Sequence, residues 1–297
     1  MKKMIAVFIA LLVFTFVGCA SETATEEQAT EYQVTTVSMN VPDVTIDGMS
    51  MTMDEYVTGV ICVELQNWFE PECFKAFAIA ARTNAVRRLN QGKELINSTS
   101  FQCFMSKTEL KELWGDDFAF YYNIAYSAAA ETHNMIVVDQ QGKPVDAMYH
   151  ALSSGQTEDS FYVTGVETSH LKGVDSHWDE KISCFEHKRF ISYDDLETKY
   201  GLKKPKFKVV SQTASGNPYE YEVCSKTYTA TELMYKLYLR SNVFKVNNLE
   251  DGIEFTTYGY GHGLGMSAYG ANGMAKEGKT YLQILNHFYT DIRVVRY

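Results

Sequence analysis

The stretch YGYGHGLGMSAYGANG, residues 258–273, places six glycines around a single histidine, His262. Glycine adopts positive φ without strain and lets the backbone pass close to a neighbouring segment or a ligand. No window satisfies GxGxxG or GxxxxGKS/T, which argues against a dinucleotide or phosphate loop. The chain is therefore expected to fold with other backbone segments packed closely against this stretch.

His262 has three further interpretations. A zinc site lacks a second ligand at a suitable spacing, because no HExxH motif or cysteine cluster lies nearby. The glycines can instead present His262, Ser267 and Tyr269 at the surface of a groove. Alternatively, His262 is a hydrogen-bonding bracket inside a tight bend. The sequence favours the groove and the bracket about equally, and it favours both over a metal ligand.

Residues 1–18 have the pattern of a secretory signal: two lysines, an apolar run, and small residues before Cys19. The run is short for a membrane span, and Gly18-Cys19 is similar to a bacterial lipobox, whose cysteine is lipidated after cleavage. Phe16 stands where a lipobox usually has an aliphatic residue, so an uncleaved anchor and simple secretion stay open. We expect an exported protein, lipid-anchored through Cys19 at the outer face of the cytoplasmic membrane or facing the cell wall.

Residues 19–33 hold few large apolar side chains and predict a flexible acidic linker. The folded domain is expected over residues 34–297, with residues 178–248 as an insertion or second lobe. The formal net charge is −10. Nucleic acids and anionic membranes bind through clustered Lys and Arg, so we expect no nucleic-acid partner and membrane contact only through the lipid anchor.

The cysteines do not indicate a metal or disulfide scaffold. Five follow Cys19, an odd number without a CxxC pair, and most are expected to be small buried apolar residues. One pairing, such as Cys184 with Cys224, stays open. We expect no metal and no cofactor.

The stretch from residue 51 to 64 predicts a helix that carries one misplaced carboxylate. Thr52 and Glu55 match the capping box that closes a first helical turn. An apolar stripe follows at helical spacing, and its next position is Glu64. Burial raises the pKa of a carboxyl group, as a general acid near neutral pH requires. The alternative is that Glu64 lies at a fraying helix end, in solvent or paired with Arg82.

A second helix is predicted from about Pro71 to Leu89, with proline in its first turn and small residues on its apolar stripe. The two helices form a hairpin whose turn places Gln66 and Trp68 near Glu64. Aromatic and amide groups around a carboxylate suit a sugar ligand, although a lone tryptophan is more often a core residue.

The remaining pattern mixes helices and strands. An irregular segment is expected over residues 90–115, a helix over 118–132, and a β-hairpin with arms at 135–138 and 145–149. Strands are expected over 207–212, 219–225 and 252–258, with helices over 231–239, 272–276 and around 282–287. The fold class is α+β: the Glu64 helical hairpin packs on a curved, mostly antiparallel sheet, with a second smaller lobe.

Three stretches in order resemble the stage II sporulation protein D / LytB domain (SpoIID) family. They are DEYVTGVICVEL with PECFKAFAIAARTNAVRRL, then YHALSSGQTE with SHLKGVDS, and finally GYGHGLGMSAYGANGMAKEGKTYLQILNHFY. The resemblance implies a cell-wall lytic transglycosylase, which cleaves the β-1,4 bond between N-acetylmuramic acid and N-acetylglucosamine and leaves a 1,6-anhydro end. It also implies peptidoglycan glycan strands stripped of stem peptides as substrate, and an amidase as partner.

The resemblance maps the family's catalytic acid onto Glu64. Together with the residue patterns above, it indicates a substrate-binding set of Gln66, Trp68, Arg82, Gln102, Tyr149, Ser153, Ser154, Thr157, Glu158, His262, Ser267 and Tyr269. No second Cys or His lies close to Gln102-Cys103, so the zinc site of some relatives is not expected.

The chain departs from the family pattern at several groove positions. Ser154 replaces a glycine, Tyr260 a tryptophan and Ala268 a glutamine, while Asn217 and Met234 stand where relatives have arginines. Two other functions therefore stay open: a wall-binding protein that stimulates an amidase, as in the LytB branch, and a glycoside hydrolase that uses Glu64 with Glu158.

Overall fold

The computed structural model describes residues 32–297, which form one compact unit. The predicted signal peptide, Cys19 and nearly all of the predicted linker lie outside the described residues. The helices are α1 (Met53–Glu64), α2 (Pro71–Asn90), α3 (Lys107–Trp114), α4 (Phe118–Glu131), α5 (Ser160–Thr164), α6 (Tyr193–Thr198), α7 (Ala230–Leu237), α8 (Ala268–Lys276) and α9 (Tyr281–Phe288). Within residues 32–297, none of the helices is long and apolar enough to cross a membrane.

The strands are short and form several small sheets in place of the single curved sheet expected. They are β1 (Thr35–Thr36), β2 (Val44–Ile46), β3 (Met49–Met51), β4 (Met135–Val138), β5 (Tyr149–His150), β6 (Glu186–Ser192), β7 (Phe207–Gln212), β8 (Pro218–Val223), β9 (Lys226–Thr229), β10 (Phe244–Asn248), β11 (Gly252–Tyr258), β12 (Met266–Ser267) and β13 (Arg293–Arg296). Most pairs are antiparallel, whereas β1–β13 and β5–β12 are parallel. The mixed α+β class is confirmed.

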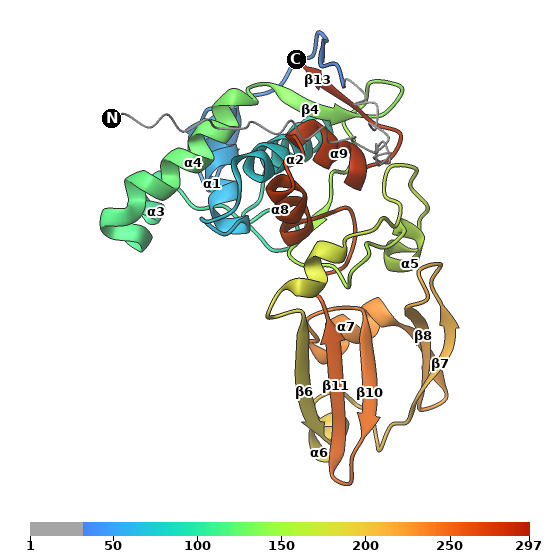
Figure 1. The fold of residues 1–297 in the computed structure, drawn as a ribbon. Helices are drawn as coiled ribbons and strands as arrows, with labels where there is room; N and C mark the ends of the chain where they lie inside the picture. Colours follow the sequence, from blue (N-terminus) through green and yellow to red (C-terminus); the bar gives the residue numbers. More distant parts are fainter. Residues whose placement is uncertain (1–31) are drawn as a thin grey trace, which may run out of the picture. The chain divides into compact units, whose positions relative to one another are not determined.

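Helix α2 is the centre of the larger hydrophobic core, because it packs against α1, α4, α8, α9 and β4 (Figure 1). Its predicted apolar stripe, including Phe77 and Ala81, is buried. Small residues on that stripe let neighbouring helices approach closely. The capping box at the start of α1 is present, with the Glu55 backbone N–H donating to the Thr52 hydroxyl at 3.2 Å.

A smaller hydrophobic core lies within residues 191–255. It is built on the antiparallel sheet β10–β11–β6 and on β8, and α6 packs on β6 and β11 (Figure 1). Phe244 and Phe255 are fully buried there, and the Tyr221 ring stacks on Phe244 at 4.8 Å between centroids. This core begins and ends further along the chain than the insertion predicted at residues 178–248, whose boundaries stay a prediction.

One local prediction was wrong, and a second was confirmed only in part. The segment expected to be irregular contains α3, which Ser106 and Glu109 close with a second capping box. The expected hairpin after β4 forms only at its turn, where Val138 makes an antiparallel bridge with Pro144 and the Val145 N–H donates to the Val137 carbonyl oxygen at 3.2 Å. Beyond the turn the two arms separate, because β4 pairs along its length with β13, while β5 pairs with β12. All five described cysteines are free, including Cys184 and Cys224.

The glycine-rich stretch connects β11 to α8 and passes against the segment 148–153. Gly259, Gly261, Gly263 and Gly265 all adopt positive φ. A Cβ atom on Gly265 would collide with the carbonyl oxygen of Met148, next to the β5–β12 pairing. The close backbone approach expected from the sequence is confirmed, and it is this approach that carries His262 to the site.

Candidate active site

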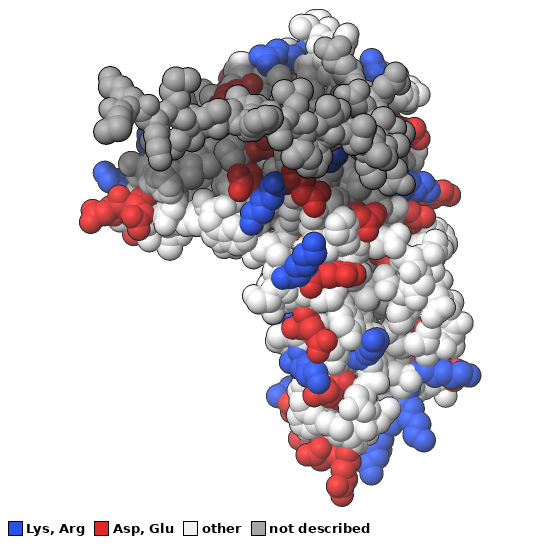
Figure 2. Space-filling view, in the orientation of Figure 1, with Lys and Arg blue, Asp and Glu red and all other residues white. Residues whose placement is uncertain are grey.

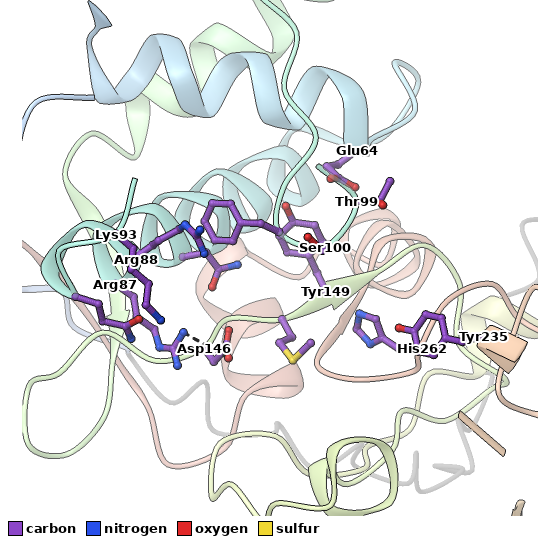
Figure 3. Close-up of a pocket in the computed structure, with 14 residues that line it drawn as sticks. Glu64, Arg87, Arg88, Lys93, Thr99, Ser100, Asp146, Tyr149, Tyr235 and His262 are labelled. Carbon is purple, nitrogen blue, oxygen red and sulfur yellow. Dashed lines mark ion pairs between the residues drawn. The ribbon is translucent and has the colours of Figure 1, made fainter. Parts of the chain in front are cut away.

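Glu64 lines a pocket with a volume of about 500 Å³. Its wall comes from the end of α1, the polar face of α2, the following loop, the segment 146–149, α7 and the glycine-rich stretch (Figure 3). The lining residues are Glu64, Asn84, Arg87, Arg88, Gln91, Lys93, Thr99, Ser100, Phe101, Asp146, Met148, Tyr149, Tyr235 and His262.

Glu64 is the last residue of α1 and is half-buried at one end of the pocket. Burial raises the pKa of its carboxyl group, and a hydrogen bond from the Cys103 backbone partly offsets this effect. The C-terminal end of a helix also disfavours an added negative charge. Arg82, which the sequence offered as an alternative partner, pairs with Asp54 instead. Glu64 therefore keeps its proton to a higher pH than an exposed glutamate does.

Tyr149 lines the pocket and is held from behind by Gln102. The Gln102 amide nitrogen donates to the Tyr149 hydroxyl at 3.0 Å, and its carbonyl oxygen accepts from the Tyr56 hydroxyl at 3.3 Å. Burial raises the pKa of Tyr149, and the Glu64 charge adds to this shift. Since the Tyr149 oxygen already accepts a hydrogen bond, its proton is available to an oxygen of a ligand.

His262 lines the pocket and also brackets the backbone. Its Nδ1 accepts from the Leu264 N–H at 3.0 Å, and the ring hydrogen-bonds to the Tyr149 backbone. Burial lowers the pKa of His262 to about 4, so the ring is neutral near pH 7. The ring of His150 lies 5.7 Å away between centroids, and burial lowers its pKa to about 3. His262 therefore has both roles that the sequence left as alternatives: it lines the groove and it brackets the backbone.

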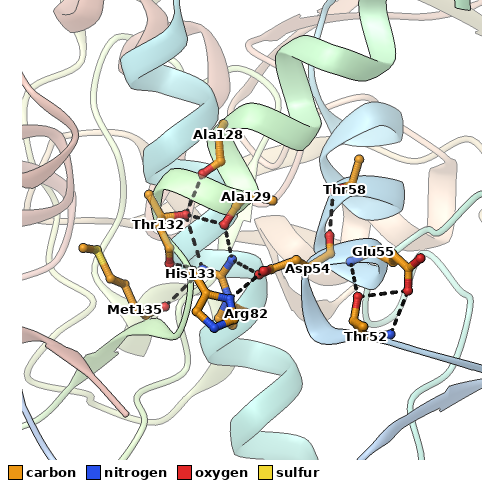
Figure 4. Close-up of polar contacts among 10 residues, drawn as sticks. All are labelled: Thr52, Asp54, Glu55, Thr58, Arg82, Ala128, Ala129, Thr132, His133 and Met135. Carbon is orange, nitrogen blue, oxygen red and sulfur yellow. Dashed lines mark hydrogen bonds and ion pairs between the residues drawn. The ribbon is translucent and has the colours of Figure 1, made fainter. Parts of the chain in front are cut away.

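Arg82 is 0 % exposed and does not line the pocket. Its guanidinium donates to Asp54 Oδ1 at 2.9 Å and to the carbonyl oxygens of Ala129, Thr132 and Met135 (Figure 4). The His133 Nδ1 atom lies 2.6 Å from the other Asp54 oxygen. These contacts tie α1, α2 and the end of α4 together and favour a structural role.

Glu158 lies in the wall of a separate small cavity, which Glu64 does not line. It is 3 % exposed, and its Oε1 accepts hydrogen bonds from Thr213, Ser215 and Asn217. Asn217, one of the departures from the family pattern, thus binds this carboxylate. The loop 153–158 is thereby joined to the turn between β7 and β8.

The other predicted substrate-binding residues lie outside the pocket. Ser153 and Thr157 are buried, and the Ser267 hydroxyl caps α8 by accepting from the Gly270 N–H at 3.2 Å. Trp68 is 52 % exposed in the α1–α2 turn, and its ring lies 6.0 Å from that of Tyr269. Gln66 is exposed in the same turn, and Ser154 is half-buried.

The basic and hydroxyl-bearing part of the pocket was not predicted. Asn84, Arg87, Arg88 and Gln91 follow one another at i, i+3, i+4 and i+7 on α2. This polar stripe opposite the apolar one was a usable signal. Tyr235 carries no such signal, because it comes from α7 and reaches the pocket only through the tertiary fold. Within residues 32–297, no three His, Cys, Asp or Glu side chains gather closely enough to hold a metal ion.

Comparisons with known proteins show which family the chain belongs to. The family model described as "Stage II sporulation protein" matches residues 46–138, which include α1, α2 and Glu64. Stage II sporulation protein D of Bacillus amyloliquefaciens is 32% identical over 258 residues, covering 82% of this chain and 74% of the relative. The Bacillus subtilis (strain 168) protein of the same name is 33% identical over 258 residues, covering 82% and 75%.

A more distant relative is the amidase enhancer of Bacillus subtilis (strain 168). It is 30% identical over 152 residues, which cover 49% of this chain and 21% of the relative. The two sporulation proteins match this chain over most of both lengths, at an identity that establishes common descent. The chain belongs to the stage II sporulation protein D (SpoIID) family.

Proposed function

We propose that this protein acts on the bacterial cell wall in sporulation or wall remodelling, as a lytic transglycosylase that cleaves peptidoglycan glycan strands. The observation that carries the proposal is Glu64, a carboxyl group whose pKa is raised by burial in a 500 Å³ pocket. Exposed or half-buried Tyr235, Phe101 and Tyr149 give that pocket aromatic faces of the kind that sugars contact.

The chemistry requires one acid that becomes a base. Protonated Glu64 donates its proton to the glycosidic oxygen as the bond to the anomeric carbon breaks. The resulting carboxylate then takes the proton of the same sugar's 6-hydroxyl, whose oxygen attacks the anomeric carbon and closes the 1,6-anhydro ring. Because the nucleophile belongs to the substrate, no second carboxylate is needed. Tyr149 is proposed to donate a hydrogen bond to a sugar oxygen beside Glu64.

A hydrolase that uses Glu64 with Glu158 is less favoured. A second carboxylate would have to lie across the same bond, about 5–10 Å from the first. Glu158 instead lines another cavity and is held by three donors.

The second candidate is a wall-binding protein that stimulates an amidase. The similarity to a protein named amidase enhancer favours it, as do Tyr260 and Ala268 at positions that depart from the family pattern. In this case glycan binding persists without cleavage.

Mass spectrometry of glycan products distinguishes these functions. Purified protein is incubated with intact peptidoglycan and with amidase-treated glycan strands. We expect 1,6-anhydro-muramic ends. Reducing ends would indicate hydrolysis, and binding without new ends would indicate the amidase-stimulating function.

A further inference from the structure

The end of the pocket opposite Glu64 is lined by cations. Arg87 and Arg88 lie in the last turn of α2, and the Lys93 N–H donates to the Arg88 carbonyl oxygen at 3.2 Å. Figure 3 shows the three side chains together at one end of the pocket and Glu64 at the other. Tyr149 lies between the two ends.

These cations are only partly neutralised. Asp146 Oδ2 lies 3.5 Å from Arg87 Nη1, and the Arg88 guanidinium stacks over the Phe101 ring at 4.7 Å. Within the part of the chain that the structure describes, neither Arg88 nor Lys93 forms an ion pair. The chain has a net charge of −10, and acidic and basic side chains are interspersed on the face that Figure 2 shows. An excess of positive charge inside a cavity of such a protein points to an anionic ligand group.

We propose that Arg87, Arg88 and Lys93 form a carboxylate-binding subsite, which holds an acidic substituent of the glycan strand away from the bond that Glu64 cleaves. The inference deepens the proposed function and rests on it. A neutral sugar needs no cations, whereas guanidinium groups pair with carboxylates through two parallel hydrogen bonds. Peptidoglycan offers carboxylates from two sources: the lactyl group of a peptide-free muramic acid, and the acidic residues of a stem peptide.

The distance between the three cations and Glu64 suits both carboxylate binding and acid catalysis. Cations beside Glu64 would stabilise its anion and lower the pKa of an acid that must hold its proton. Burial raises the pKa of Glu64, and the Cys103 backbone hydrogen bond offsets this only in part. The three side chains are thus positioning residues, whose loss should raise KM more than it lowers kcat.

The test measures equilibrium binding to the full chain carrying Glu64→Gln, purified in mild detergent, so that binding is read without turnover. The probes are a muramic-acid tetrasaccharide with free lactyl carboxylates, the same sugar with these groups converted to primary amides, the same sugar with stem peptides, and neutral chitotetraose. We expect a carboxylate-bearing probe to bind about tenfold or more tightly than the amide, as charge-assisted hydrogen bonds allow. This preference should fall as salt is raised.

Replacing Arg87, Arg88 and Lys93 together by Gln should abolish the preference, and Lys111→Gln, an exposed lysine of α3, should not change it. Tighter binding of the free-carboxylate sugar assigns the lactyl group, and tighter binding of the peptide-bearing sugar assigns the stem peptide. The proposal is overturned if the amide and the carboxylate probes bind equally, or if no probe binds. It is also overturned if the triple variant weakens the binding of chitotetraose as much as the binding of the carboxylate probe. A failure of the wild type to cleave glycan would refute the proposed function without altering this result.

Discussion

Removing the partner of the buried guanidinium should strongly destabilise the fold. In Asp54→Ala, Arg82 stays fully buried but loses its charged partner at 2.9 Å. Removing one member of a buried ion pair costs about 3–5 kcal/mol. Asp54 is 20 % exposed, and the carbonyl oxygens of Ala129, Thr132 and Met135 still accept from Arg82. We therefore expect the lower end of that range, a loss of about 3 kcal/mol in the free energy of unfolding.

Urea unfolding at pH 7, followed by circular dichroism, measures this loss. Asp116→Ala, an exposed acid outside any ion pair of the described residues, is the matched control and should change stability by less than about 0.5 kcal/mol. The double variant Asp54→Leu with Arg82→Met should be more stable than Asp54→Ala, because no charge is left buried. A loss below about 1 kcal/mol in Asp54→Ala, or an Arg82→Lys variant with native stability and a raised KM, would refute the structural role.

Three further predictions concern the supports of the site. Gly265→Ala should lower the melting temperature more than Gly142→Ala, since both residues have positive φ but only the first would collide with a neighbour; equal losses would contradict the packing account. Glu158→Ala should cost about 1–3 kcal/mol and speed proteolysis of the β7–β8 hairpin, so unchanged cleavage kinetics would argue against the loop connection. The pKa of His150 is lowered to about 3, so the unfolded chain binds a proton that the folded chain does not. Stability from this group is therefore full above about pH 6.5 and is lost as the pH falls toward 3. The free energy of unfolding, measured by urea titration at pH 7 and 4.5, should fall less on acidification in His150→Gln than in the wild type. Identical losses would contradict the assignment of this pH dependence to His150.

The sequence predicted those helices and strands that are marked by capping residues, apolar periodicity or proline within the element itself. The capping box and stripe of α1, the proline start of α2, and strands β7 and β11 all appear where their patterns placed them. Helix α3 was missed although Ser106 and Glu109 carried the same capping signal as α1. Glu64 stood out because a carboxylate interrupts an apolar stripe, and this pattern is visible without any structure.

The pairing of distant segments was not predictable in the same way. Strand β4 pairs along its whole length with β13 from the other end of the chain, and only its last residues bridge to the following segment at Pro144 and Val145. Nothing in residues 135–149 encodes that choice, because both candidate partners are short and apolar. Arg82 was predicted to bind substrate, and the carbonyl groups that surround it come from a helix end some 50 residues further on. Tyr235 likewise reaches the pocket from α7, a helix that packs in the smaller hydrophobic core.

The most direct test of the central claim is the rate at which Glu64→Gln forms 1,6-anhydro-muramic ends on amidase-treated glycan strands, measured by mass spectrometry. Glu112→Gln, an exposed glutamate of α3, is the matched control. General acid catalysis typically contributes about 10²–10⁴-fold. The account predicts that Glu64→Gln loses at least about 100-fold in rate while folding and glycan binding persist, and that the control keeps the wild-type rate. Product formed by Glu64→Gln at the wild-type rate would contradict the account.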